Sequence, residues 1–174
     1  MVCDDDHVES PTSQRTQSWV KHQVEIDAPA ARLYDFVADL DSMADLSPEC
    51  VACWWLGDAT YAAAGARFRG RCRRGWRRWT TTAEVMEATP GRRISWKVTY
   101  WTRPVANWAY EFVELDNGRT MVTEGYVDQR RPVLRRTSGL ITGSTDRAAR
   151  NDDTMHTTLA RLKAAAEAGG TPSR

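Results

Sequence analysis

The run of residues 66–87, ARFRGRCRRGWRRWTTTAEVME, constrains the fold more than any other part of the chain. Every second residue from Arg67 to Arg73 is arginine, and the residues between them are small or apolar. Side chains of a β-strand point to opposite faces in turn, so this period of two predicts a strand with one cationic and one less polar face. Gly75 and Trp76 then interrupt the alternation, which predicts a turn into a second, antiparallel strand.

The arginines in this run allow two interpretations. Seven of them lie between Arg67 and Arg78, a density that also fits contact with nucleic acid or an anionic membrane. The whole chain, however, has 24 Lys and Arg against 23 Asp and Glu, and dedicated nucleic-acid binders carry a strong positive excess. We therefore expect the arginines to form the solvated face of a half-buried sheet, where they also discourage edge-to-edge pairing, and we do not expect a nucleic-acid partner.

Length and composition limit the class of protein. A chain of 174 residues suits one domain, and eight tryptophans suggest a large core or a lined cavity. No apolar run approaches the ~20 residues that span a bilayer, and no signal-peptide pattern follows the N-terminus, so we expect a cytoplasmic protein with reduced cysteines. Cys50 and Cys53 resemble half of a metal knuckle, but no second pair matches them, so a structural role is favoured over metal or redox chemistry.

The predicted elements begin with a strand and a short helix. Residues 1–17 are polar and without period, which predicts a disordered tail. Residues 19–26 alternate as a strand, and the following Asp-Ala-Pro predicts a helix start with Asp27 near the cap and Pro29 in the first turn. A second short helix is expected over residues 41–45.

The rest of the chain predicts six strands and one long helix. The strands are expected over residues 51–56, 67–74, 77–88, 92–100, 107–115 and 119–128. Residues 132–143 are ambiguous and fit a loop that folds over an opening. A long helix is expected over residues 145–168, followed by a flexible tail at residues 169–174.

This order predicts an α+β fold of the helix-grip type. A seven-stranded antiparallel sheet with one long helix, and two short helices after the first strand, can cover its apolar face only if the sheet curves around the helix. A curved sheet of this kind leaves a cavity beside the helix, and such cavities bind small apolar ligands.

The order and several local motifs resemble the START-like superfamily, and within it bacterial polyketide cyclase/dehydrase and lipid-transport proteins. The residues that carry the resemblance are Ile26-Asp27-Ala28-Pro29, Leu33 to Asp39, Gly65 to Gly70, Pro90-Gly91-Arg92-Arg93, Asn117 to Thr120, Val122-Thr123-Glu124 and Leu159 to Lys163. The resemblance covers residues 18–168. It implies a ligand-binding domain that takes a lipid, acyl or polyketide-like partner, and it implies no shared set of catalytic residues. Because the sequence shows no cofactor motif and no complete set of metal-binding cysteines, we expect neither a cofactor nor a metal.

Residues on the apolar side of the predicted strands and helix are the candidate ligand contacts. They are Phe68, Trp79, Thr81, Trp96, Trp108, Tyr110, Phe112, Met155 and Leu159. Most residues of such a face simply form core, so a ligand is expected to reach only the open end of the cavity.

Polar residues on the same side are candidate catalytic groups. Glu124 inside an apolar cavity would have a raised pKa and serve as an acid or base, with Tyr110 or Tyr126 as a hydrogen-bond donor. A solvated position of Glu124 at the sheet rim is the alternative, and it is favoured. His22 and His156 lack an acid or nucleophile at a fixed spacing and are expected at the solvated surface.

Two functions therefore stay open from the sequence. One is binding or carriage of a hydrophobic small molecule, and the other is a cofactor-independent polyketide aromatase/cyclase or dehydratase that acts in the same cavity. No phosphate loop, nucleophile elbow or dinucleotide fingerprint is present. The residue pattern leaves the ligand and the oligomeric state open.

Overall fold

The computed structural model describes residues 19–130 and 147–172. The predicted tail over residues 1–17 and the ambiguous segment 132–143 lie outside the described residues. The elements are β1 (Val20–Ile26), α1 (Ala30–Ala38), α2 (Leu40–Leu46), β2 (Cys50–Leu56), β3 (Arg67–Arg74), β4 (Arg77–Thr89), β5 (Arg93–Tyr100), β6 (Arg103–Glu114), β7 (Thr120–Asp128) and α4 (Arg147–Glu167). This order confirms the predicted α+β fold. Within the described part of the chain, no helix is both long and apolar enough to cross a membrane.

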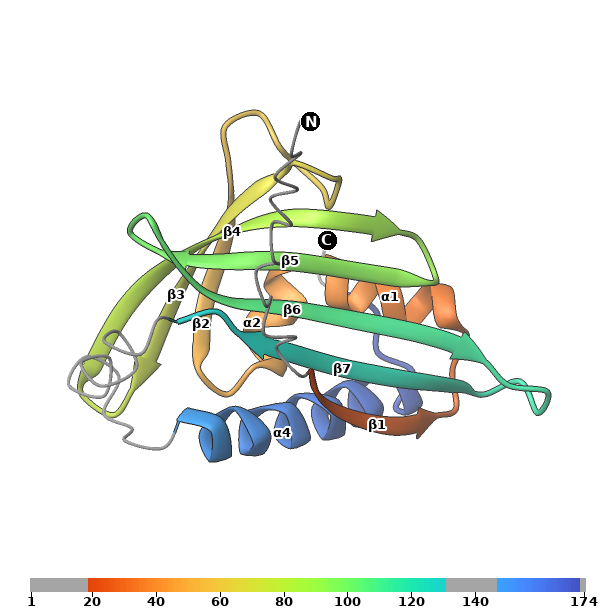
Figure 1. Ribbon diagram of the computed structural model, residues 1–174. Helices are drawn as coiled ribbons and strands as arrows, with labels where there is room; N and C mark the ends of the chain where they lie inside the picture. Colours follow the sequence, from red (N-terminus) through yellow and green to blue (C-terminus); the bar gives the residue numbers. More distant parts are fainter. Residues whose placement is uncertain (1–18, 131–146, 173–174) are drawn as a thin grey trace, which may run out of the picture.

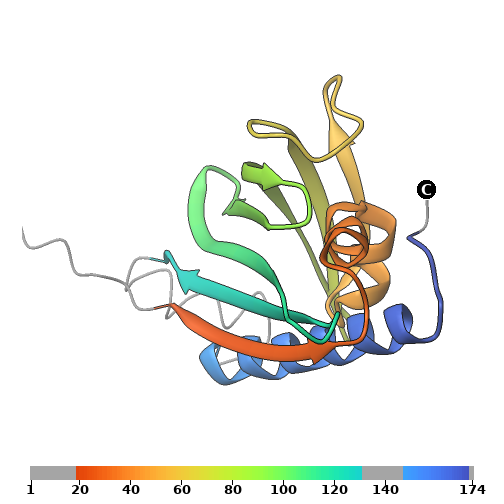
Figure 2. The same ribbon diagram turned by 90° about the vertical axis from the view of Figure 1, so that its right-hand side faces the viewer.

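The seven strands form one antiparallel sheet in the order β1-β7-β6-β5-β4-β3-β2 (Figure 1). Strands β2 to β7 follow one another as a meander, and β1 pairs with the free edge of β7. The register shifts between Cys50 and Ala52, between Val85 and Glu87, and between Val98 and Thr99. Bulges bend a strand and increase its twist, so these irregularities explain why the sheet is strongly curved (Figure 2).

The helices lie on the concave side of the sheet. Figures 1 and 2 show α4 running along β1 below the sheet, with α1 and α2 beside it. Leu33 of α1, Ile94 of β5, Val122 of β7 and Leu162 of α4 are at most 2% exposed and belong to one hydrophobic core. Burial of each such side chain contributes roughly 1.5–3 kcal/mol, which fastens the helices to this end of the sheet.

The first helix does not begin as predicted. Its N-cap is Pro29, which is extended with φ −62° and ψ 144°, and the helix starts at Ala30. Asp27 lies two residues before the cap, near it as predicted, but the expectation that Pro29 is in the first turn is wrong, because Pro29 is itself the cap. The N–H of Asp27 donates to Glu167 Oε1 at 3.1 Å. The second helix has the side-chain cap that the first one lacks: Asp39 accepts hydrogen bonds from the N–H and the hydroxyl of Ser42.

Strand β3 has the bounds and the faces that its arginine pattern predicts. Arg67, Arg69, Arg71 and Arg73 are exposed, whereas Gly70 on the other face is buried. Strand β6 differs, because it begins at Arg103 rather than at residue 107. Proline lacks an N–H and usually ends a strand pattern, but Pro104 pairs with Thr99 next to a bulge, where a missing ladder hydrogen bond is tolerated.

Candidate functional site

A cavity of about 240 Å³ lies between the concave face of the sheet and the three helices. Strands β2 to β7 supply most of its wall, and α1, α2 and α4 close the other side. Seven aromatic side chains line it: Trp55, Phe68, Trp79, Trp96, Tyr100, Trp108 and Tyr110. The cavity exists because the sheet curves away from α4 farther than the side chains between them can fill.

The aromatic side chains hold one another in place. Trp96 stacks on Tyr110 with ring centroids 5.7 Å apart and an interplanar angle of 26°. Phe68 meets Trp96 edge-on at 6.1 Å, and Trp55 meets Phe68 edge-on at 5.7 Å. Offset stacked and edge-to-face pairs are the favoured aromatic geometries, so this wall is rigid and shaped before any ligand arrives.

Glu124 of β7 and Tyr110 of β6 form the polar centre of the wall. They stand opposite each other in the β6–β7 register, and their side chains are hydrogen-bonded. Glu124 is 2% exposed and Tyr110 is 1% exposed, so the expectation of a solvated Glu124 at the rim is wrong. Position 124 has the same parity as the buried Val122 and Tyr126, and parity along the strand is what directs the carboxyl inward.

Burial controls the ionisation of this pair. Desolvation raises the pKa of Glu124 from 4.5 to about 8, and the hydrogen bond from Tyr110 lowers it only in part. Burial also raises the pKa of Tyr110 well above its usual range, and the neighbouring Glu124 adds to this effect. Among the described residues, Oε2 of Glu124 is a buried oxygen without a hydrogen-bond partner, and Glu124 is one of the residues that line the cavity.

Ion pairs mark a second, more polar part of the cavity wall. Asp128 and Arg130 both line the cavity and make a two-pronged pair, with Nε to Oδ1 at 2.9 Å and Nη2 to Oδ2 at 2.7 Å. Glu49 also lines the cavity and accepts from Nε of Arg150 at 3.0 Å. The cavity wall is therefore largely apolar and aromatic, and it also contains charged side chains that are paired.

Three cysteines, Cys50, Cys53 and Cys72, contribute sulfur to the wall. The Sγ atoms of Cys50 and Cys53 are 3.0 Å apart, and both thiols are free. Residues three apart on a regular strand face opposite sides, but the bulge between Cys50 and Ala52 brings both thiols into the cavity wall. The hydrogen bond between them lowers the pKa of the Cys50 thiol and raises that of Cys53.

Six of the nine predicted ligand contacts line the cavity. These are Phe68, Trp79, Thr81, Trp96, Trp108 and Tyr110. Their role in binding stays a prediction, but their position is the one the alternating pattern requires. Trp79 of β4 and Trp96 of β5 are each 8% exposed, and both line the cavity.

The other three predicted contacts, Phe112, Met155 and Leu159, are buried outside the cavity wall. Phe112 lies two residues beyond Tyr110 on β6, where Tyr34 of α1 meets its ring edge-on at 6.0 Å. Met155 and Leu159 are on the apolar stripe of α4, whereas the α4 residues in the wall are the polar Asn151, Thr154 and Thr158. The apolar stripe of α4 therefore marks the helix face that packs in the core, whereas a different set of α4 residues lines the cavity.

Tyr126, the second tyrosine proposed as a donor, is 3% exposed and does not line the cavity. Its ring lies under Trp108 with centroids 5.1 Å apart and an interplanar angle of 27°. Of the three candidate catalytic side chains, only Glu124 and Tyr110 therefore share the cavity.

His22 and His156 lie outside the cavity wall. His156 is exposed as expected, but the expectation of a solvated His22 is wrong. The side chain of His22 is only 18% exposed, and its Nε2 lies 2.6 Å from Oδ1 of Asp152. The two residues are 130 positions apart in the chain, so no local spacing indicated the contact.

Comparison with models of known protein families gives one match. Residues 19–167 match the family described as polyketide cyclase/dehydrase and lipid transport. No relative was found among curated proteins.

Solved structures share the fold at low identity. The chain is similar to protein DR_A0006 of Deinococcus radiodurans, with 20% identity, a TM-score of 0.62, and 87% of this chain and 99% of that chain covered. It is similar to protein CV1439 of Chromobacterium violaceum, with 14% identity, a TM-score of 0.65, and 86% and 97% covered. It is also similar to the di-domain ARO/CYC StfQ from the steffimycin biosynthetic pathway, with 17% identity, a TM-score of 0.63, and 85% and 44% covered.

Proposed function

The chain belongs to the polyketide cyclase/dehydrase and lipid transport family, and from this premise we propose that it binds one compact hydrophobic molecule that carries a carbonyl or hydroxyl oxygen. The observation that carries this proposal is a cavity with an aromatic wall and one buried, unsatisfied carboxyl oxygen. Apolar cavities with a few placed polar groups are the usual form of small-molecule sites.

The size of the cavity limits the ligand. Its volume of about 240 Å³ lies just below the ~300–1,000 Å³ of pockets that hold drug-sized ligands. This favours a ring compound or a short acyl chain over a long-chain lipid. The stacked pair of Trp96 and Tyr110 offers a flat surface, which suits a planar ligand.

Glu124 gives the site its preference for an oxygen atom. With a pKa of about 8, its carboxyl is largely protonated at pH 7 and donates a hydrogen bond to a carbonyl oxygen. A purely hydrocarbon ligand would leave Oε2 without a partner, and a buried unsatisfied polar group costs about 1–3 kcal/mol. A ligand that satisfies this atom is therefore bound more tightly than its hydrocarbon analogue.

Binding can be tested with a fluorescent naphthol as probe and with tryptophan variants. Trp96→Ala removes one face of the aromatic wall, so we expect the Kd for the naphthol to rise by about tenfold or more. Trp101→Ala is the matched control, because Trp101 is 86% exposed and does not line the cavity. Equal Kd values for the two variants would contradict the proposal.

The natural ligand can be identified by native mass spectrometry of protein purified from its own host. We expect one added mass below that of a long-chain lipid, released on denaturation. A bound mass in the range of a two-chain lipid would contradict the size argument.

A second function is favoured by one observation, the placement of an acid–base group next to a hydroxyl inside the cavity. Glu124 and Tyr110 fit a cofactor-independent polyketide aromatase/cyclase or dehydratase. In that reaction the ionised fraction of Glu124, which grows as the pH approaches its pKa of about 8, takes a proton from a methylene between two carbonyls, and the Tyr110 hydroxyl donates to the enolate oxygen. The enolate carbon bonds to a second carbonyl carbon, and Glu124 returns the proton to the new alkoxide. The structural similarity to a di-domain ARO/CYC protein supports testing this reaction.

The enzyme hypothesis is tested with a synthetic triketone and Glu124→Gln. General acid–base catalysis contributes roughly 10²–10⁴-fold, so the variant should lose at least a hundredfold in turnover while retaining the naphthol probe. Glu84→Gln is the control, because Glu84 pairs with Lys97 and does not line the cavity. Equal turnover in wild type and Glu124→Gln would leave ligand binding as the function.

A further inference from the structure

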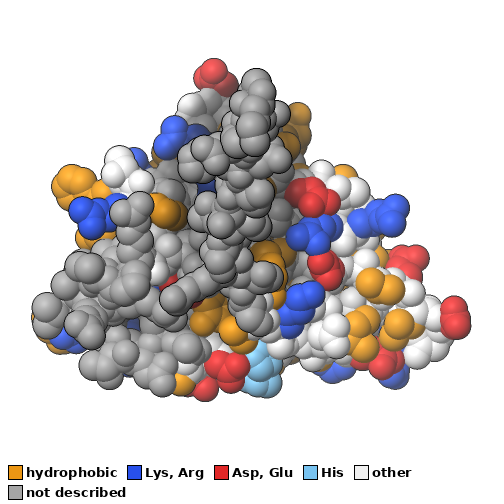
Figure 3. Space-filling view, viewed as in Figure 1, with side chains coloured by type: hydrophobic (Ala, Val, Ile, Leu, Met, Phe, Trp, Pro, Cys, Tyr) orange, Lys and Arg blue, Asp and Glu red, His pale blue; other side chains and the backbone are white. Residues whose placement is uncertain are grey.

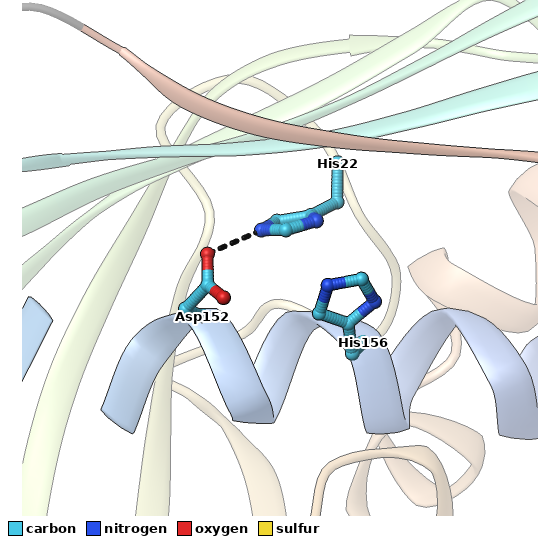
Figure 4. Close-up of side chains that lie close together, drawn as sticks. All are labelled: His22, Asp152 and His156. Carbon is cyan, nitrogen blue, oxygen red and sulfur yellow. Dashed lines mark hydrogen bonds and ion pairs between the residues drawn. The ribbon is translucent and has the colours of Figure 1, made fainter. Parts of the chain in front are cut away.

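Three metal-ligating side chains meet at the seam between β1 and α4. His22 projects from β1, and Asp152 and His156 project from α4, four residues apart and so on the same helix face (Figure 4). Nε2 of His22 lies 2.6 Å from Oδ1 of Asp152, and the two imidazole rings have centroids 4.1 Å apart. One ligand atom from each residue lies within 4.8 Å of the other two.

This cluster is separate from the cavity. None of its three residues lines the cavity wall, whereas Asn151, Thr154 and Thr158 of the same helix do. Helix α4 thus presents one face to the cavity and a neighbouring face to β1. Figure 3 shows histidine surface at the lower edge of the molecule beside acidic side chains, so the seam is reached from solvent.

A simple ion pair does not account for the whole cluster. His22 and Asp152 would suffice to join β1 to α4, but His156 adds a second imidazole in contact with the first. The His156 side chain is exposed and Asp152 is 46% exposed, so both can turn without disturbing the core. Two imidazoles and one carboxylate, converging from two elements, form a donor set for a transition metal.

The geometry fits a first-row divalent ion after small rotations. Nitrogen and oxygen ligands of Zn²⁺ lie at about 2.0–2.2 Å from the metal, which in a tetrahedral site places them roughly 3.4 Å from one another. To bind the ion, Nε2 of His22 and Oδ1 of Asp152 must move apart from 2.6 Å, and the more widely separated ligand atoms must approach one another by about 1 Å. Rotation of the exposed side chains can supply these changes. Among the described residues the group has three members, which leaves a fourth position for water.

We propose that His22, Asp152 and His156 form a binding site for Zn²⁺ or a similar divalent transition ion at the β1–α4 seam. The bound ion links residues 130 positions apart and fastens the edge strand of the sheet to the long helix. An ion that binds the folded chain and not the unfolded one stabilises the fold by mass action. At a Zn²⁺ concentration a hundredfold above Kd, we expect Tm to rise by about 5–10 °C.

The test is a calorimetric titration of tag-free, metal-free protein with Zn²⁺. We expect one equivalent to bind, and we expect His22→Gln and His156→Gln to weaken binding by about a hundredfold or more. His7→Gln is the matched control, since His7 is the remaining histidine of the chain and the proposal gives it no role. His156 is exposed, so His156→Gln keeps the fold even if His22→Gln does not, and the metal-free Tm of each variant checks this.

Competing thiols are tested with Cys50→Ser/Cys53→Ser, in which Zn²⁺ binding and its Tm shift should persist. The absence of saturable binding in wild type, an unchanged Kd in His156→Gln, or loss of binding in the double cysteine variant would each overturn the proposal. Glu124→Gln should leave Zn²⁺ affinity within twofold of wild type. A negative result for Zn²⁺ binding thus does not contradict the proposed ligand binding in the cavity, and a negative result for ligand binding does not contradict the Zn²⁺ site.

Discussion

Among single residues, Glu124 is a carboxylic acid almost fully removed from water, in the cavity wall beside Tyr110. Its folded pKa of about 8 lies above the ordinary value of 4.5, so the folded protein holds this proton more tightly than the unfolded chain. The associated stability is complete below pH 4.5 and is lost as the pH rises towards 8, with a slope of at most about 1.4 kcal/mol per pH unit.

Glu124→Gln should remove this pH dependence, because glutamine mimics the protonated acid at every pH. We expect the variant to gain stability over wild type between pH 5 and pH 8, measured by urea denaturation at both values. Glu84→Gln, which changes a side chain outside the cavity, should keep the wild-type slope. A slope in Glu124→Gln equal to that of wild type would show that another group is responsible.

Cys50 is the second residue whose surroundings change its chemistry. The hydrogen bond from Cys53 lowers the pKa of the Cys50 thiol, so its thiolate persists at a lower pH than that of an ordinary cysteine. We expect iodoacetamide to modify Cys50 faster than Cys72 at pH 6.5, as followed by peptide mass spectrometry. Cys53→Ala removes the donor and should slow the modification, and an unchanged rate in that variant would contradict this explanation.

On the scale of elements, the short helix α2 depends on its cap. Asp39 accepts hydrogen bonds from both the N–H and the hydroxyl of Ser42, and α2 carries Leu40 and Met43 into the cavity wall. Arg161 of α4 donates to the carbonyl oxygens of Asp45 and Leu46 at the other end of the helix. Both ends of α2 are therefore held, which keeps this side of the cavity in place.

Asp39→Ala should cost about 1 kcal/mol of unfolding free energy, because it leaves the backbone N–H of Ser42 without a side-chain partner. Asp41→Ala is the matched control: Asp41 is an exposed carboxylate of the same first turn and loses only its interaction with the helix dipole. Urea denaturation of both variants measures the difference. A cost for Asp41→Ala as large as that for Asp39→Ala would indicate that charge, not capping, stabilises α2.

At the scale of the whole molecule, the sheet separates two surfaces with different chemistry. The convex face carries the exposed arginines of β3, and Arg71 lies over the ring of Trp54 at 5.5 Å. The concave face carries the aromatic cavity wall. Because the backbone of the sheet lies between them, charge changes on the convex face have no direct contact with a ligand in the cavity.

Replacing Arg69 and Arg71 together by Gln should therefore leave the Kd for the naphthol probe within about twofold of wild type. Binding of a neutral ligand in the cavity should also change little between 50 and 300 mM salt, in contrast to the steep dependence of phosphate-backbone contacts. Fluorescence titration of both proteins measures these effects. If the Kd depended strongly on salt and the double variant lost this dependence, the ligand would bind at the arginine face and not in the cavity.

Much of the architecture could be predicted because it depends on local periodicity. The alternation from Arg67 to Arg73 indicates which face of the strand is exposed to solvent, and the structure has strand β3 at Arg67–Arg74, as predicted. Parity also placed Phe68, Trp96 and Tyr110 in the cavity wall. It did not separate them from Phe112, because residues of equal parity on one strand face the same side at different distances from the packed end.

The sequence by itself determined the order of strands and helices, their inward and outward faces and the presence of a curved sheet around a helix, since each follows from patterns within a few residues. Only the tertiary structure decided the depth of Glu124, the bulge that brings Cys50 to Cys53, and the meeting of His22 with Asp152. These depend on contacts between strands or across 130 residues, where no repeating pattern in the chain records which side chains will be neighbours.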